Sequence, residues 1–198
     1  MKKSTWIVLW IVAFLVFWIM GGYNWLVWAQ ETLNKAWGNV ESQYQRRADL
    51  IDNLVATVRG AADQELEVLT QVVEARASAT QSNININDAQ ELAQFQASQW
   101  ELSWALSRLL VSVEAYPEVQ SNETFQKLMD DLTWTENRVN EARIAYNDAV
   151  QMYNGRVRTF PWVIIANLFW FDTASSFQSQ PWADVAPEVD FWERFDEE

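Results

Sequence analysis

The sequence predicts an all-α protein, in which an N-terminal transmembrane helix continues into an antiparallel up-and-down helical bundle with a short fourth helix. Three observations predict this class. An uncharged apolar run opens the chain, apolar residues then recur in steps of three and four, and no stretch alternates as a half-buried strand would. We divide the chain into a transmembrane anchor (1–29), a helical bundle (30–171) and an acidic, aromatic C-terminal tail (172–198).

The anchor is the first element. Residues 5–20 carry no charge and the apolar run extends to Ala29, whereas about 20 apolar residues suffice to span a bilayer. A cleaved signal peptide is the alternative, because Val27 and Ala29 could occupy the −3 and −1 positions. The run is longer than a usual signal core, and bulky Trp28 lies between those positions. We therefore expect an uncleaved anchor.

The aromatic side chains of the anchor share one face. At 100° per residue they fall within about a third of the helix circumference. They could simply face lipid tails, or they could form a seam against a neighbouring chain, with Gly21 on the same face allowing close approach. The residues of this seam are Trp6, Trp10, Phe14, Phe17, Trp18, Trp25 and Trp28.

The charges beside the anchor give a direction to the chain. Lys2, Lys3 and the amino terminus lie before the apolar run, and the next charges follow only from Glu31 onward. The excess of positive charge on the cytoplasmic side of membrane proteins favours a cytoplasmic N-terminus and an exported body.

The anchor is expected to continue as the first helix of the bundle. No proline interrupts the chain from the anchor to beyond Ala79, and Gly38 and Gly60 weaken a helix without requiring a break. The spacing is that of one long amphipathic helix. The apolar positions are Leu33, Trp37, Val40, Tyr44, Ile51, Val55, Val58, Ala62, Leu66, Leu69 and Val73.

A polar loop at 80–88 precedes the second helix. Asn87 is a candidate N-cap, with Gln90 three residues later as in a capping box. The helix is expected to end near Ala115, because Pro117 disfavours helical geometry in the residue before it. Its core face is Leu92, Phe95, Leu102, Leu106, Leu109, Leu110 and Val113.

The second helix also carries an apolar stripe opposite its core face. A helix that is apolar on two faces has two partners. The second partner could be another helix of the same bundle or a neighbouring subunit. The stripe, a possible second interface, consists of Ala93, Trp100, Trp104 and Val111.

The third helix is expected over 123–157 after a loop at 116–125, with Ser121 or Asn122 as its cap. The apolar segment 162–171 is too short to span a bilayer. We expect it to cap the bundle as a short fourth helix, and the alternative is membrane contact through Trp162 and Trp170. Part of the acidic tail should lie against the bundle or a partner, because its aromatic side chains are costly to leave in water.

Composition excludes most kinds of enzyme. The chain has no histidine and no cysteine, which removes the commonest general base, the commonest transition-metal ligand and every thiolate. The carboxylates do not converge in the sequence pattern, so we expect no catalytic residue, no metal and no cofactor. The formal net charge of −13 argues against nucleic acid as a partner, because phosphate binding requires a basic patch.

A charged block on the first helix is the remaining candidate site. Its side chains either bind a ligand between helices or form ion pairs that fix the register of the bundle, and we favour the ion pairs. Tyr146-Asn147 and Tyr153-Asn154 recur seven residues apart, along one stripe of the helix. We expect their buried hydroxyls to bond to facing helices rather than to a ligand. The polar register network comprises Arg46, Arg47, Asp49 and Asn53 with Glu136 and Arg138.

Several blocks in order resemble the LemA family of bacterial membrane-anchored helical proteins. The segment that carries the resemblance best is "YNWLVWAQETLNKAWGNVESQYQRRADLIDNLVATVRGAADQE", followed by "LSRLLVSVEAYPEVQSNETF", "TENRVNEARIAYNDAVQMYN" and "FPWVIIANLFWF". The sequence departs from the family pattern at Asp52, where proline is usual, in "AADQE", and at Trp170, where a small residue is usual. The resemblance implies a single N-terminal helix in the bacterial inner membrane, an antiparallel helical bundle outside it, and no settled reaction.

These observations predict a non-enzymatic scaffold that self-associates in the membrane. The resemblance adds that one branch of the family is associated with magnetosome membrane formation, and that some members are encoded beside membrane zinc proteases. The alternative function is therefore an adaptor that presents clients to a membrane protein such as a zinc metalloprotease. The expected partners are the lipid bilayer, further copies of the chain, and a second membrane protein.

Overall fold

The computed structural model describes residues 3–61, 67–80 and 84–178, and it confirms the all-α class. The expected positions Lys2, Ala62 and Leu66, and the tail from residue 179 onward, lie outside the described residues. No strand occurs in the described ranges. The helices are α1 (Lys3–Ala61), α2 (Glu67–Ala79), α3 (Ala89–Val113), α4 (Pro117–Gln120), α5 (Glu123–Arg158) and α6 (Trp162–Leu168).

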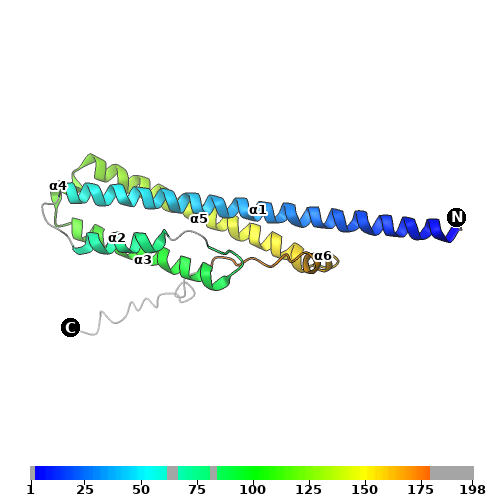
Figure 1. Ribbon diagram of the computed structural model, residues 1–198. Coiled ribbons are helices and arrows are strands. Elements are labelled where there is room, and N and C mark those ends of the chain that lie inside the picture. The colour runs from blue at the N-terminus through cyan, green and yellow to red at the C-terminus, as the bar shows by residue number, and fades with distance from the viewer. Residues whose placement is uncertain (1–2, 62–66, 81–83, 179–198) are drawn as a thin grey trace, which may run out of the picture.

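Helix α1 is a single uninterrupted helix of 59 residues. At 1.5 Å per residue it is roughly 88 Å long. Its N-terminal part projects beyond the rest of the chain, and its C-terminal part runs through the bundle (Figure 1). The first buried apolar side chain of the helix is Leu26, which is fully buried. The expectation that the membrane helix continues directly into the bundle is confirmed.

The expectation that this first helix reaches Ala79 is wrong. Helix α1 ends at Ala61 and α2 begins at Glu67, lying against α3. The buried positions of α2 are Leu69, Val72, Ala75 and Ala79. Val73, which we expected among the buried apolar positions of the long first helix, is 44% exposed. The new helix therefore turns a slightly different face inward than a straight continuation of α1 would.

Four helices form an up-and-down bundle in which α1 lies against α5 and α2 lies against α3 (Figure 1). The buried side chains divide into two clusters along its length. The distal cluster, around Leu54, Leu102 and Leu109, is closed by α2. The membrane-proximal cluster, around Trp37 and Tyr146, lies beyond the reach of the 13-residue α2.

Residues 171–178, which we call the strap, close the membrane-proximal cluster. The strap buries the side chains of Phe171, Ala174 and Phe177 against the bundle. It contains no helix, so its main-chain groups need partners from elsewhere. This stretch is the part of the acidic tail that the structure describes.

Two asparagines of α5 supply those partners. Asn154 Oδ1 accepts from Ala174 N at 2.9 Å, and its Nδ2 donates to Ala174 O at 2.8 Å. Asn147 brackets Phe177 in the same way, at 2.9 Å and 3.1 Å. The Tyr146 hydroxyl donates to Ser175 O at 2.8 Å. The expectation that the buried hydroxyls bond to facing helices is wrong for Tyr146, whose hydroxyl binds the strap's main chain instead.

Helix caps fix the ends of the later helices. Asp88, rather than the expected Asn87, caps α3, and its carboxylate accepts from the N–H groups of Gln90 and Glu91. Asn122 caps α5 as predicted. The predicted loop before α5 contains one turn of helix, α4, which begins at Pro117. Proline suits a first helical position, because its missing N–H would have no partner there.

Candidate interaction surfaces

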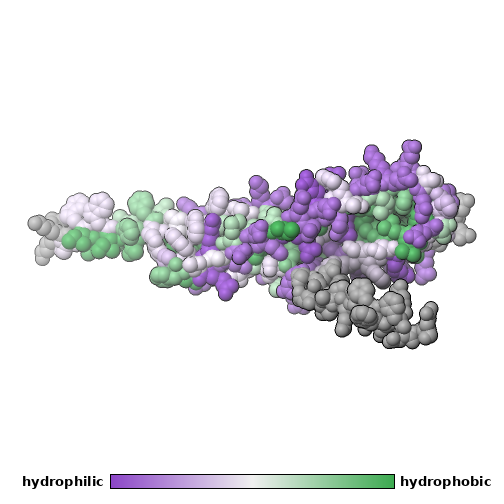
Figure 2. Space-filling model, turned by 180° about the vertical axis from the view of Figure 1, so that it is seen from behind, coloured by the Kyte–Doolittle hydropathy of each residue, from purple (hydrophilic) through white to green (hydrophobic). Residues whose placement is uncertain are grey.

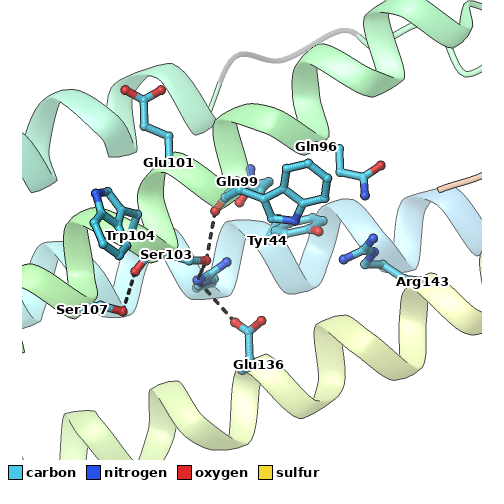
Figure 3. A pocket seen from close by; sticks show the side chains of 11 residues that line it. Tyr44, Gln96, Gln99, Glu101, Ser103, Trp104, Ser107, Glu136 and Arg143 are labelled. Atoms are coloured by element: carbon cyan, nitrogen blue, oxygen red, sulfur yellow. Dashed lines mark hydrogen bonds and ion pairs between the residues drawn. The ribbon is translucent and has the colours of Figure 1, made fainter. Parts of the chain in front are cut away.

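A groove between α1, α3 and α5 is a concave surface of the bundle that carries both charged and aromatic side chains (Figure 3). It holds a cavity of about 510 Å³. Tyr44 and Arg47 reach it from α1, and Glu136 and Arg143 from α5. Helix α3 contributes the wall that contains Ser103 and Trp104. The groove therefore combines two guanidinium groups with aromatic surface.

Arg47 lies at the centre of this groove and is 6% exposed. Its Nη2 donates to Ser103 Oγ at 2.7 Å and lies 3.3 Å from Glu136 Oε2. The Ser103 hydroxyl donates in turn to Gln99 O at 3.0 Å. Arg47 thus links α1 to both α3 and α5. A second cavity of about 340 Å³ adjoins the same arginine on the distal side and is walled by apolar residues such as Leu106.

Arg143 closes the membrane-proximal end of the groove. Its guanidinium lies 4.8 Å from the ring centroid of Phe177, and its Nη2 donates to Gln178 O at 3.5 Å. Burial raises the pKa of Tyr44, and the nearby charges of Arg143 and Arg47 offset part of that rise. Arg143 therefore adds a second guanidinium to the groove, beside the buried Tyr44 hydroxyl.

Two of the remaining members of the predicted polar network, Arg46 and Arg138, lie against Trp134. The guanidinium groups of Arg46 and Arg138 lie 4.8 Å and 4.9 Å from its ring centroid. Arg138 also pairs with Glu141, at 2.8 Å. This stack joins α1 to α5 on the surface of the bundle. Two members stay within α1: Asp49 accepts from the side chain of Gln45, and the Asn53 carbonyl accepts from Thr57.

Sequence reasoning missed Arg143, Ser103 and the buried glutamines of α3. A signal for Arg143 was present, because it lies four residues after Val139 and three before Tyr146. That is a core position of the helix, and Arg47 occupies the corresponding kind of position between Tyr44 and Ile51. A charged residue in phase with the core of a bundle is the pattern that could have found both.

The aromatic seam of the anchor divides into two parts. Its first four residues point outward from the projecting part of α1, where hydrophobic residues gather (Figure 2). They are Trp6, Trp10, Phe14 and Phe17, all exposed. Trp18 and Trp25 instead contact Trp162 of α6, with ring centroids 6.0 Å and 5.1 Å apart. Trp28 lies 5.2 Å below the guanidinium of Arg156.

Helix α6 is held against α1 at Gly22. A side-chain Cβ there would lie 2.9 Å from Trp162 Cζ3 and would collide with Ile165 Cδ1, so a larger residue would require both side chains to shift. Gly21, which the sequence suggested for close approach, has open space around its Cα.

The second apolar stripe of α3 faces outward. Trp104 and Val111 are 68% and 67% exposed, and Ala93 is exposed too. Trp100 is half-buried and lines the groove. In the described ranges, no bundle helix covers Trp104 or Val111.

Residues 36–191 match the sequence model of the LemA family. The chain belongs to the LemA family. Two relatives are the magnetosome proteins MamQ 1 and MamQ 2 of Paramagnetospirillum magneticum, each 29% identical over 197 residues, 90% of this chain and 72% of theirs. A third is the magnetosome protein MamQ of Magnetospirillum gryphiswaldense, 27% identical over 204 residues, 92% of this chain and 75% of its own.

This LemA-family chain is membrane-associated, with one candidate spanning helix in the part that the structure describes. The apolar window of α1 is only 6% buried, so it is not the core helix of a soluble fold. Cleavage after Ala29 would cut a continuous helix and remove Leu26 from the core. The structure therefore favours an anchor that stays attached.

Proposed function

We propose that this LemA-family protein is a membrane-anchored, non-enzymatic scaffold that self-associates side by side through the outer stripe of α3. The observation that carries the proposal is the exposure of Trp104 and Val111 on a surface that lipid cannot reach. Trp104 follows Ser103, which bonds Arg47, and Arg47 lies 22 residues beyond Trp25 on α1. At 1.5 Å per residue this is roughly 33 Å past the aromatic belt.

Charge supports the same surface. A net charge of −13 makes copies of the chain repel one another, so they can meet only where charge is sparse. Helix α3 carries three charged residues in 25: Glu91, Glu101 and Arg108. Its stripe runs along the bundle, parallel to α1, so copies anchored in one bilayer can join their stripes without leaving the membrane. The exposed aromatic seam of the anchor can add contacts between the same copies.

The relatives support a role in organising a membrane. They are named as magnetosome proteins, and an anchored bundle that assembles laterally is suited to shape or mark a patch of bilayer. The self-association would be the activity itself, and the partners would be the bilayer and further copies of this chain.

The test is the protein mass of the particle in mild detergent, by light scattering corrected for bound detergent. The intact chain should form a large homo-oligomer. Trp104→Asp with Val111→Asp should shift it to smaller particles, whereas the control Met152→Asp, at an exposed apolar residue of α5, should leave it unchanged. A monomeric intact chain, or an equal effect of the control, would overturn the proposal.

A second candidate function is that of an adaptor, and the groove around Arg47 favours it. A buried arginine open to a cavity, beside Trp104 and Arg143, suits an extended segment with acidic and apolar side chains. The client or partner would be a second membrane protein, such as a zinc metalloprotease. A photo-crosslinking residue at Ser107, which lines the groove, should then capture a different protein, and one at Met152 should not. Capture of only the same chain would count against the adaptor.

For orientation, we propose a cytoplasmic N-terminus and an exported body in the bacterial inner membrane. The absence of cysteine allows a clean test with one introduced thiol. Gln151→Cys, at an exposed site of α5, should react with a membrane-impermeant maleimide added to intact spheroplasts. Reaction only after lysis would reverse the orientation.

A further inference from the structure

We propose that α6 and the Phe169–Trp170 turn form a second membrane contact, which inserts into the surface of the leaflet from which α1 emerges. The occupant of this surface is lipid: acyl chains against the apolar side chains and phosphate groups against two arginines beside them. The contact requires that α1 spans the bilayer, and it is independent of self-association.

The position of α6 along α1 is the first argument. About 20 apolar residues cross the hydrocarbon core, so a span that begins at Thr5 ends near Asn24. Helix α6 packs on Gly22 and reaches Trp18 and Trp25 through Trp162. It is therefore fixed at the depth where the bilayer core meets the headgroups.

The apolar surface that α6 leaves uncovered is the second argument. One face of the helix packs inward through Ile165 and Ala166. Large apolar side chains on the helix and in the residues that flank it are exposed instead. A surface of this kind is costly in water and is favourable against lipid. Its members are Phe160, Ile164, Leu168, Phe169 and Trp170.

Trp170 adds a third argument. It is 86% exposed, and its φ of 56° places it in the left-handed region. This geometry is unfavourable for a residue other than glycine, because its Cβ crowds the following carbonyl oxygen. An exposed indole at such a position gains nothing from the fold in water. Tryptophan is, however, the residue that concentrates at the boundary between acyl chains and headgroups.

Two arginines supply the polar half of the contact. The Arg156 guanidinium lies 4.3 Å from the ring centroid of Trp25 and 5.2 Å from that of Trp28. Arg158, two residues later and two before Phe160 in the sequence, is exposed. In a chain of net charge −13, this placement of two cations at the depth of the headgroups matches lipid phosphate. The aromatic rings hold Arg156 in place, and the arginine in turn covers the end of the seam.

The contact can be tested by fluorescence in proteoliposomes of phosphatidylethanolamine and phosphatidylglycerol. The full chain would carry one cysteine labelled with the environment-sensitive dye NBD, at Ile164→Cys or at Trp170→Cys. Lipids with a doxyl nitroxide near the headgroup should quench most of the emission at both sites, and the emission should be shifted to the blue. The matched control Gln151→Cys, on the exposed side of α5, should show neither effect and should be quenched by aqueous iodide.

A label at Phe14→Cys, quenched by a nitroxide deep in the acyl chains, reports whether the anchor is inserted. Quenching at Phe14 with iodide access at Ile164 and Trp170 would overturn the second contact and leave the spanning helix intact. Labels at Ile164 and Trp170 that resist both quenchers would also overturn it, because another protein surface would then cover α6. Loss of quenching at Phe14 itself would overturn both the span and the contact.

Discussion

Arg47 occupies a position at which the periodicity of α1 requires an apolar side chain. It lies in phase with Tyr44, Ile51 and Leu54, and it is buried like them. Its ion-pair partner Glu136 is 57% exposed, so solvent screens the attraction between the two. A charge that gains so little from its pair has little value for stability. The adaptor proposal gives this buried charge a second role, in binding a ligand in the groove.

Arg47→Met should therefore change the free energy of unfolding by less than about 1 kcal/mol, because methionine keeps the apolar stem and removes the desolvated charge. Urea unfolding in mild detergent, followed by circular dichroism, measures it. A loss above about 3 kcal/mol would mean that the ion pair holds the bundle together, and the binding interpretation would fail.

Thr135 offers a second prediction at this scale. Its side chain is fully buried, and its hydroxyl has no hydrogen-bond partner. Thr135→Val keeps the shape and removes an unpaired polar group, so it should stabilise the protein by about 1 kcal/mol. Thr133→Val, at an exposed hydroxyl that donates to Met129 O, is the control and should not stabilise. A lower unfolding midpoint for Thr135→Val would reveal a partner for the hydroxyl.

The buried tyrosines predict a loss of stability at alkaline pH. Burial raises the pKa of Tyr146 above the ordinary value of 10.0, and burial raises that of Tyr44 and Tyr153 too. Above about pH 10 the unfolded chain loses these protons while the folded chain keeps them, so the free energy of unfolding falls. Below that pH their contribution is constant. Tyr146→Phe should flatten the fall in denaturant titrations, and an unchanged slope would contradict the assignment.

The spacing of two asparagines on α5 matches the spacing of the strap residues that they bind. Asn147 and Asn154 are seven residues apart on a helix, about 10.5 Å at 1.5 Å per residue. They bracket Phe177 and Ala174, three residues apart in extended chain, about 10 Å at 3.3 Å per residue. The two spacings agree, so both amides can bind the strap at once without straining either segment.

Breaking either bracket should release the strap. Asn147→Ala or Asn154→Ala removes two hydrogen bonds, which are worth about 1–3 kcal/mol together. Chymotrypsin should then cut at Phe177 faster than in the parent chain, as followed by mass spectrometry. Gln151→Ala, on an exposed side chain between the two asparagines, should leave the rate unchanged. Equal cleavage of all variants would mean that burial of Phe177 alone retains the strap.

Sequence patterns predicted α3 and α5 well, because each begins at a capping side chain and ends at a proline or a polar boundary. The end of α1 at Ala61 could not be predicted, since Leu69 follows Val58 at a spacing that also fits one helix. The cap moved from Asn87 to Asp88 because both side chains can accept the same bonds, and only the register of the helix decides. The strap was hidden for another reason: asparagine binds main chain, which leaves no pattern in the partner's residues.

At the scale of the whole molecule, retention of the anchor is the main prediction. The intact mass of protein purified from membranes should correspond to the full 23.1 kDa chain. A chain that starts after Ala29 would lose Leu26, a fully buried residue, and its unfolding free energy should fall by about 3 kcal/mol or more. A mature protein that begins at residue 30 would show that the first segment is a signal peptide.

The order of elements, and the class of the fold, were accessible from periodicity and loop composition. The pairing of α1 with α5 and of α2 with α3 was not, because an apolar stripe says that a helix has a partner without naming it. The groove could not be predicted either, because it depends on this pairing. It lies where Arg47 of α1 and Arg143 of α5, both at core positions of their helices, face the side of α3 that carries Ser103.

Because α1 is continuous, a tilt of the anchor moves the far end of the bundle sideways. From Trp25 to Ala61 the helix extends 36 residues past the aromatic belt, roughly 54 Å. Helix α1 has no break between the anchor and the bundle, so a change in the tilt of the anchor tilts the bundle by the same angle. A helix accommodates a thinner bilayer by leaning. A lean of about 10° would sweep the far end of α1 sideways by roughly 9 Å, so that bilayer thickness is converted into displacement at the distant end of the bundle.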